Sequence, residues 1–168
     1  MSKGSSCAQP RKAASENLGN VLVLGLGKTG QAVCDYCLDQ ADRLSSLTVA
    51  AGARNDAALE KAARLENQGA RVLFDTTSFS HHYDLCIASP GISQFSDFYQ
   101  NALAHADEVI SEVEFAWRES ARDSVWVAIT GTNGKTTTTA LCAHLLQTAG
   151  KKALAVGNIG DTCIEAIS

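Results

Sequence analysis

Short apolar runs alternate with amphipathic stretches through the first two thirds of the chain. The runs predict buried strands at 21–24, 47–51, 71–74, 84–87 and 107–110. Between and after them, apolar residues recur with helical spacing, which predicts helices at about 29–40, 56–68, 95–104 and from Ser111 onward. Strands that alternate with helices in this way indicate an α/β fold with a parallel sheet.

A second strand–turn–helix unit follows later in the sequence. Val125–Ile129 is an apolar run that predicts a buried parallel strand, and a helix opens at Lys135. Ala153–Val156 predicts one more strand, and 157–160 predicts a turn at its carboxyl end.

The composition changes twice along the chain. Residues 1–19 are rich in Ser, Ala, Lys and Asn without periodicity, which predicts a flexible tail. The polar and charged stretch Ser120–Ser124 predicts a domain boundary. We therefore expect a first α/β domain at 20–119 and the beginning of a second one at 120–168.

The turn before the helix at Lys135 has the composition of a phosphate-binding loop. Gly131 and Gly134 allow the backbone N–H groups to point inward, and the helix start adds the positive end of its dipole. Lys135 would supply a mobile charge to phosphates, and the Thr136 hydroxyl would reach Mg²⁺. The usual P-loop has a first glycine where this chain has Ile129, so an ordinary glycine-rich turn is the alternative.

The first strand leads into a complete G-x-G-x-x-G at Gly25–Gly30, which opens a helix. An NAD-binding unit should end its second strand with Asp or Glu, to hold the ribose hydroxyls. The chain has no carboxylate at Val49–Ala53, which disfavours a dinucleotide ligand. Arg54 follows and is a candidate for an anionic group, with a solvated loop arginine as the alternative.

Ser89, Pro90 and Gly91 form a turn after the 84–87 strand. Open α/β sheets bind ligands at the carboxyl ends of their strands. The Ser89 hydroxyl and the Gly91 N–H are therefore candidate ligand contacts, with a plain Pro-Gly turn as the alternative.

Two further groups of polar residues have structural explanations. Ser111 and Glu114 match a capping box at a helix start, so the acids of this segment are not assigned to catalysis. Cys34 and Cys37 lie three apart on a predicted helix with no second pair, which predicts half-buried thiols rather than a zinc or redox site.

Composition narrows the class of protein. Apolar residues make up 45% of 168, enough for a core, and a net charge of −4 without a long basic run disfavours a general nucleic-acid binder. No apolar run reaches membrane-spanning length, and residues 1–19 lack the apolar segment of a secretory signal. These features, with cysteines that show no disulfide pattern, predict a cytoplasmic protein.

Four motifs stand in one order: GLGKTG (25–30), ASPGI (88–92), GTNGKTT (131–137) and GNIG (157–160). Together they resemble the Mur ligase family, over residues 20–168. SPG and the SEVEF segment (111–115) are most similar to the members that add D-glutamate to UDP-N-acetylmuramoyl-L-alanine. The resemblance implies a Rossmann-like domain that binds a UDP-sugar and no dinucleotide, followed by the start of a P-loop domain that binds ATP.

The resemblance also implies roles for single residues. It places the UDP-substrate site at Gly27, Lys28, Thr29, Arg54, Ser89, Pro90, Gly91 and Asn158. It places ATP at Gly131, Thr132, Asn133, Gly134, Lys135, Thr136 and Thr137. Lys135 and Thr136 would act in catalysis, with Thr136 beside Mg²⁺. The family's Asp-Thr-Arg after the second strand is not matched, so only Arg54 corresponds to it.

The implied reaction is ATP-driven amide formation in peptidoglycan precursor synthesis, and hence in cell-wall biogenesis and cell division. The substrate carboxylate becomes an acyl-phosphate, which the amine of D-glutamate attacks. The family's remaining metal ligands and its amino-acid domain would lie beyond this sequence. We therefore expect a fragment without ligase activity of its own, and no nucleic-acid partner, membrane insertion or particular oligomer is implied.

Three other functions stay open on the sequence. The first is another Mur ligase, such as the L-alanine-adding enzyme. The second is a nucleotide-binding regulatory module without chemistry. The third is an NAD-dependent oxidoreductase, which the ending of the second strand and the additional phosphate loop at Gly131–Thr136 disfavour.

Overall fold

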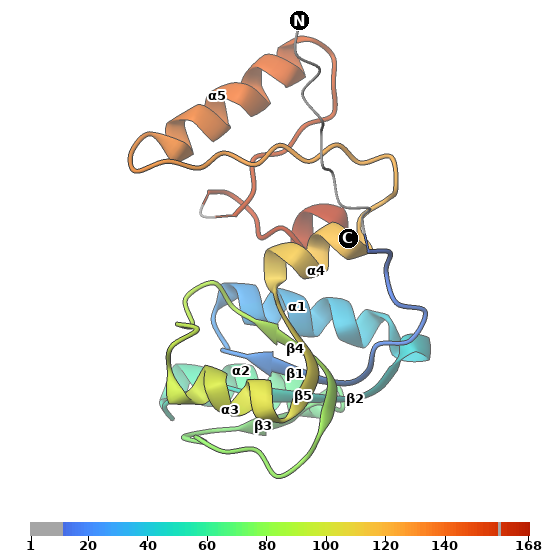
Figure 1. The fold of residues 1–168 in the computed structure, drawn as a ribbon, viewed down its shortest axis with the longest axis vertical. Coiled ribbons are helices and arrows are strands. Elements are labelled where there is room, and N and C mark those ends of the chain that lie inside the picture. The colour runs from blue at the N-terminus through green and yellow to red at the C-terminus, as the bar shows by residue number, and fades with distance from the viewer. Residues whose placement is uncertain (1–11, 158) are drawn as a thin grey trace, which may run out of the picture.

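The structure is a computed structural model that describes residues 12–157 and 159–168. Its body is a sheet with the strand order β3-β2-β1-β4-β5, and every neighbouring pair is parallel (Figure 1). The strands are β1 (Gly19–Leu24), β2 (Leu44–Ala50), β3 (Arg71–Leu73), β4 (Tyr83–Ala88) and β5 (Ala106–Ser111). The predicted α/β class with a parallel sheet is confirmed.

The α-helices are α1 (Lys28–Asp39), α2 (Asp56–Asn67), α3 (Asp97–Ala104), α4 (Glu112–Glu119) and α5 (Lys135–Thr148). Short 3₁₀ turns lie at Ala41–Arg43 and Glu165–Ile167. Asn55, Ser96 and Ser111 cap α2, α3 and α4, because each side chain accepts a backbone N–H of the first helical turn. None of the helices in the described part of the chain has the length and apolar character needed to cross a membrane.

Alternate residues of β1 pack on opposite faces of the sheet, which explains its unbroken apolar sequence. Val21 and Val23 belong to the core under α1, α2 and α4, whereas Leu22 and Leu24 belong to the core under α3. α1 and α4 lie side by side above the sheet in Figure 1. The rings of Tyr36 of α1 and Phe115 of α4 pack edge to face, with their centroids 5.7 Å apart.

β1 and β4 are neighbours although β2 and β3 come between them in the sequence. The helix that follows β1 packs on one face of the sheet, and the helix that follows β4 packs on the other. The two connections therefore diverge at the carboxyl ends of these strands. A crevice at such a point is where open α/β sheets bind ligands.

The described part of the predicted tail packs against the sheet domain. Leu18 is buried in the core, and the Ser15 carbonyl accepts a hydrogen bond from the Arg43 guanidinium at 2.6 Å. Lys12 pairs with Glu108 at 2.8 Å. Residues 12–17 are exposed and Leu18 is buried, so the core of the domain begins at Leu18, and the flexibility expected of the tail stays a prediction.

The two predicted strands of the second unit are wrong. Residues 125–129 and 153–156 lie outside the sheet. Val156 makes one isolated bridge, to Asp161, which is not part of the sheet. Val125 is 88% exposed and Val127 62%. A strand needs a neighbour to receive its backbone hydrogen bonds, and no strand in the described residues pairs with 125–129. α5 accordingly lies apart from the sheet in Figure 1.

Candidate functional site

A cavity of about 530 Å³ opens at the carboxyl ends of β1 and β4. Its walls come from the β1–α1 loop, the turn after β4, the start of α4 and the segment that follows α5. The lining residues include Gly27, Lys28, Thr29, Ser89, Pro90, Gly91, Glu112, Gly157 and Thr162. Six of the predicted UDP-site residues therefore surround one cavity, and their role in binding stays a prediction.

The β1–α1 loop forms one wall because α1 approaches it closely. A Cβ atom added at Gly30 would lie 1.9 Å from the Gly25 carbonyl oxygen, so only glycine fits between the helix and the loop. α1 begins at Lys28 with Gly27 as its N-cap, and no side chain caps it. The first N–H groups of the helix and its positive dipole end are thus available to an anion.

Ser89 supplies an unused polar group at the cavity. Its N–H donates to the Leu24 carbonyl at 3.1 Å, which ties the turn to the end of β1. Its Oγ is buried and has no hydrogen-bond partner among the described residues. A buried hydroxyl without a partner costs free energy, so a rotation of the Ser89 side chain that lets it pair with a ligand group in the cavity would be favoured.

Lys28 reaches across the cavity to the segment after α5. Its ammonium donates to the Gly160 carbonyl at 3.0 Å, and it lies 3.6 Å from the Glu165 carboxylate and 3.9 Å from that of Asp161. Hydrogen bonds from Thr162 and the charge of Lys28 hold the pKa of Glu165 below its usual value. The Lys28 ammonium therefore places a positive charge beside the start of α1.

Glu112 is the member of the site that the sequence analysis missed. It is 2% exposed at the first position of α4, and its carboxylate accepts the Ile164 N–H at 2.7 Å. Burial raises its pKa, opposed by backbone hydrogen bonds from Ile164 and Cys163. The sequence signal that could have identified Glu112 is its position directly after β5, at the carboxyl edge of the sheet, where such folds bind ligands.

The predicted capping residues beside it behave as expected in part. The Ser111 side chain accepts the Glu114 N–H at 3.2 Å, which confirms the N-cap. The Glu114 carboxylate accepts the Arg118 Nε at 2.8 Å. Glu114 therefore has a structural partner on its own helix.

Of the two remaining predicted UDP-site residues, one lies away from the cavity and the other is not described by the structure. Arg54 is not among the lining residues, and its guanidinium lies 5.5 Å from the centre of the Phe74 ring. This cation–π contact gives the exposed arginine a partner beyond the ends of β2 and β3. Asn158 lies outside the described residues, although its neighbour Gly157 lines the cavity.

The loop at Gly131–Thr137 has the backbone expected of a phosphate-binding turn. Gly131 and Gly134 both have positive φ, 155° and 75°, and α5 starts at Lys135 without a side-chain cap. The Lys135 ammonium folds back onto the carbonyls of Gly131 and Thr132, at 2.7 and 3.2 Å. The loop is open to solvent, and a phosphate there would meet free N–H groups and a movable cation.

Thr136 is exposed at the start of α5, and no group of three metal-ligating side chains occurs in the described residues.

Cys34 and Cys37 of α1 are fully buried rather than half-buried as predicted, and both are free thiols. Burial is the main cause that raises the pKa of Cys37 to about 12, which keeps the thiol protonated and unreactive.

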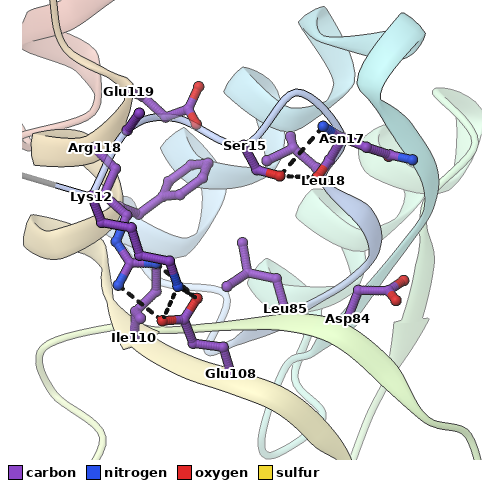
Figure 2. A pocket seen from close by; sticks show the side chains of 12 residues that line it. Lys12, Ser15, Asn17, Leu18, Asp84, Leu85, Glu108, Ile110, Arg118 and Glu119 are labelled. Carbon is purple, nitrogen blue, oxygen red and sulfur yellow. Dashed lines mark hydrogen bonds and ion pairs between the residues drawn. The ribbon is translucent and has the colours of Figure 1, made fainter. Parts of the chain in front are cut away.

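A second cavity, of about 200 Å³, lies at the amino ends of β1 and β4, beneath residues 12–18. Figure 2 shows Lys12 and Arg118 converging on Glu108 at its edge. The hydrogen bond from Arg118 is the main cause that lowers the pKa of Glu108 to about 2. These charges satisfy one another, so this cavity offers a structural cluster and not a ligand site.

Comparison with known proteins agrees with this arrangement. Residues 129–167 match the model of the Mur ligase middle domain. Over 147 residues the chain is 39% identical to the UDP-N-acetylmuramoylalanine–D-glutamate ligase of Thermobifida fusca, covering 87% of this chain and 31% of that protein. The chain is therefore similar to Mur ligases over most of its length. It spans about a third of the length of the curated relatives that it matches over most of its own length.

Two further Mur ligases extend the comparison. The ligase of the same name from Microcystis aeruginosa is 34% identical over 155 residues, which cover 88% of this chain and 33% of that protein. The one from Rippkaea orientalis is 49% identical over 82 residues, or 49% of this chain and 18% of that protein. The similarity thus extends over both the sheet domain and the P-loop segment.

Proposed function

We propose that this chain provides the UDP-sugar site of an ATP-dependent ligase that adds D-glutamate to UDP-N-acetylmuramoyl-L-alanine. One observation supports this most strongly. The uncapped start of α1, the Lys28 ammonium and the unpaired Ser89 hydroxyl all meet at a single cavity. A nucleoside diphosphate uses all three, because it brings phosphate oxygens to the helix start and to Lys28 and brings its nucleoside hydroxyl groups to the serine.

In this proposal the diphosphate lies at the first turn of α1, beside Lys28 and Thr29. Ser89, Pro90 and Gly91 line the uridine part of the substrate. The absence of a carboxylate after β2 fits a UDP-sugar better than a dinucleotide, because nothing at Val49–Ala53 accepts the ribose hydroxyls. Arg54 is proposed for the uracil end, which requires it to leave its contact with Phe74.

ATP is proposed to lie at Gly131–Thr137. The phosphates would replace the loop carbonyls as partners of Lys135, whose charge offsets the charge that builds up on the transferring phosphoryl group. Thr136 is the residue placed to hold Mg²⁺, which protein sites bind through one or two side chains together with phosphates and water. When bound, Mg²⁺ would neutralise phosphate charge.

The proposed reaction has two steps. The alanyl carboxylate attacks the γ-phosphate, ADP leaves, and the D-glutamate amine then displaces phosphate from the acyl-phosphate. Binding at the α1 cavity would hold the carboxylate end toward the ATP site. We place this reaction in the cytoplasm, and we expect no ligase activity from the 168-residue chain alone, since the strand before the P-loop is not formed.

A thermal-shift titration tests the proposal. UDP-N-acetylmuramoyl-L-alanine, NAD and Mg-ATP are each added to the full 168-residue chain. A ligand at a hundred times its Kd adds about 2.7 kcal/mol to the free energy of unfolding. Stabilisation by the UDP-sugar and not by NAD supports the proposal, whereas stabilisation by NAD alone would replace it with an oxidoreductase.

A further inference from the structure

The segment after α5 is built into the sheet domain. Ile164 is fully buried, and Cys163 and Ile164 pack in the same core as Phe115 and Ala116 of α4. Thr162, also buried, lines the UDP-sugar cavity. A segment that follows the P-loop helix in sequence therefore forms part of the first domain's ligand site.

Glu112 is the polar group that fastens this segment. Its carboxylate accepts the backbone N–H of Ile164 at 2.7 Å, and no cation pairs with it among the described residues. A buried carboxylate without a cation is costly. The first turn of α4 and the Ile164 N–H compensate for that cost, and the same hydrogen bond holds the backbone at Ile164 against α4.

Lys28 holds the same segment from the other side of the cavity. It donates to the Gly160 carbonyl, and the Thr162 N–H and hydroxyl both donate to the Glu165 carboxylate. An anionic ligand at α1 would compete for Lys28. Among the described residues, the hydrogen bond to Glu112 would then be the side-chain hydrogen bond that still joins the sheet domain to the 159–164 segment.

We propose that Glu112 is a positioning residue that keeps the 159–164 segment, with Thr162, in place as the wall contacting the distal, sugar–peptide part of the UDP substrate. This rests on the proposed function. It assigns Glu112 to the distal end of the ligand and not to the nucleotide, because the α1 loop and the Ser89 turn do not depend on the 163–164 backbone.

Glu112→Gln is the test variant, and Glu114→Gln is its matched control in the same helical turn. Glutamine keeps the volume but removes the charge, so the charge-assisted hydrogen bond from the Ile164 N–H becomes a weaker neutral one. Glu114 is absent from the cavity lining and is bonded to Arg118. Both variants are made in the full 168-residue chain.

Hydrogen exchange without ligand is measured first. We expect the Cys163 and Ile164 amides to exchange at least about tenfold faster in Glu112→Gln, and unchanged in Glu114→Gln. Calorimetry with UDP-N-acetylmuramoyl-L-alanine and with UDP follows. Glu112→Gln should weaken binding of the UDP-sugar about tenfold and binding of UDP less than about threefold.

Several results would overturn the inference. Unchanged amide exchange, unchanged affinities, or equal losses for UDP and the UDP-sugar would each leave Glu112 with a purely structural role. If Glu112→Gln fails to fold, exchange in the unmodified chain decides: the UDP-sugar must slow these two amides more than UDP does. A wild-type chain that binds neither ligand refutes the proposed function as well, whereas normal binding by both chains refutes only the role of Glu112.

Discussion

Gly30→Ala tests the close approach of α1 to its loop. The new Cβ would lie 1.9 Å from the Gly25 carbonyl oxygen and 3.4 Å from the Ser89 Oγ. The first obstacle is backbone at the end of β1, so no side-chain rotation relieves it. Restoring an ordinary contact of 3.4 Å requires the helix or the loop to move by about 1.5 Å.

Such overpacking costs about 1–3 kcal/mol, and the better helix propensity of alanine returns at most about 1 kcal/mol. Because the obstacle is backbone, we expect a net loss of about 2 kcal/mol in the free energy of unfolding, or about 4–8 °C in Tm. Urea denaturation followed by circular dichroism measures it.

Gly27→Ala is the matched control for Gly30→Ala. No atom lies within 4 Å of a Cβ at this position, and its φ of −71° suits any residue. We expect a loss of about 0.5–1 kcal/mol from the N-cap substitution, smaller than the loss in Gly30→Ala. If Gly30→Ala is as stable as wild type or Gly27→Ala, α1 does not approach the loop as closely as described.

Three further outcomes follow from the same contacts. Glu119→Gln removes one partner of a largely buried pair, with Arg43 at 2.7 Å, and should cost about 2 kcal/mol in urea denaturation; an unchanged midpoint would refute the pairing. The pKa of Glu108 is lowered to about 2 from 4.5, so its ionised form stabilises the fold above pH 5 and loses that effect as the pH falls. The stability difference between wild type and Glu108→Gln should therefore shrink between about pH 5 and pH 2, and a constant difference would contradict the bond from Arg118. In peptide-level alkylation of the native protein, Cys142 should react faster than the two buried cysteines of α1, whereas equal rates would show that those thiols are accessible.

The strands of the sheet domain were predictable because burial on both faces leaves a continuous apolar sequence. The same pattern at Val125–Ile129 and Ala153–Val156 gave wrong predictions. Apolar sequence expresses a preference for burial, but a strand forms only where a neighbouring strand receives its hydrogen bonds. The described residues provide no such neighbour for either segment.

The cavity was predictable in part for a similar reason. Loops at the carboxyl ends of adjacent parallel strands must converge, so the β1–α1 loop and the Ser89 turn were found from sequence. Glu112 was not predicted as a site residue, because the start of a helix already explains an acidic residue at that position. Its burial depends on a contact with Ile164, far along the chain, which no local pattern contains.

Calorimetric titration of UDP-N-acetylmuramoyl-L-alanine into the 168-residue chain and its Lys28→Met variant tests the central claim most directly. Lys152→Met, an exposed lysine outside the cavity lining, is the control. The account predicts binding by wild type and the control, and about tenfold weaker binding by Lys28→Met, because a charge-assisted bond to the diphosphate is lost. No binding by wild type, or equal affinity in all three proteins, would contradict a UDP-sugar site at the start of α1.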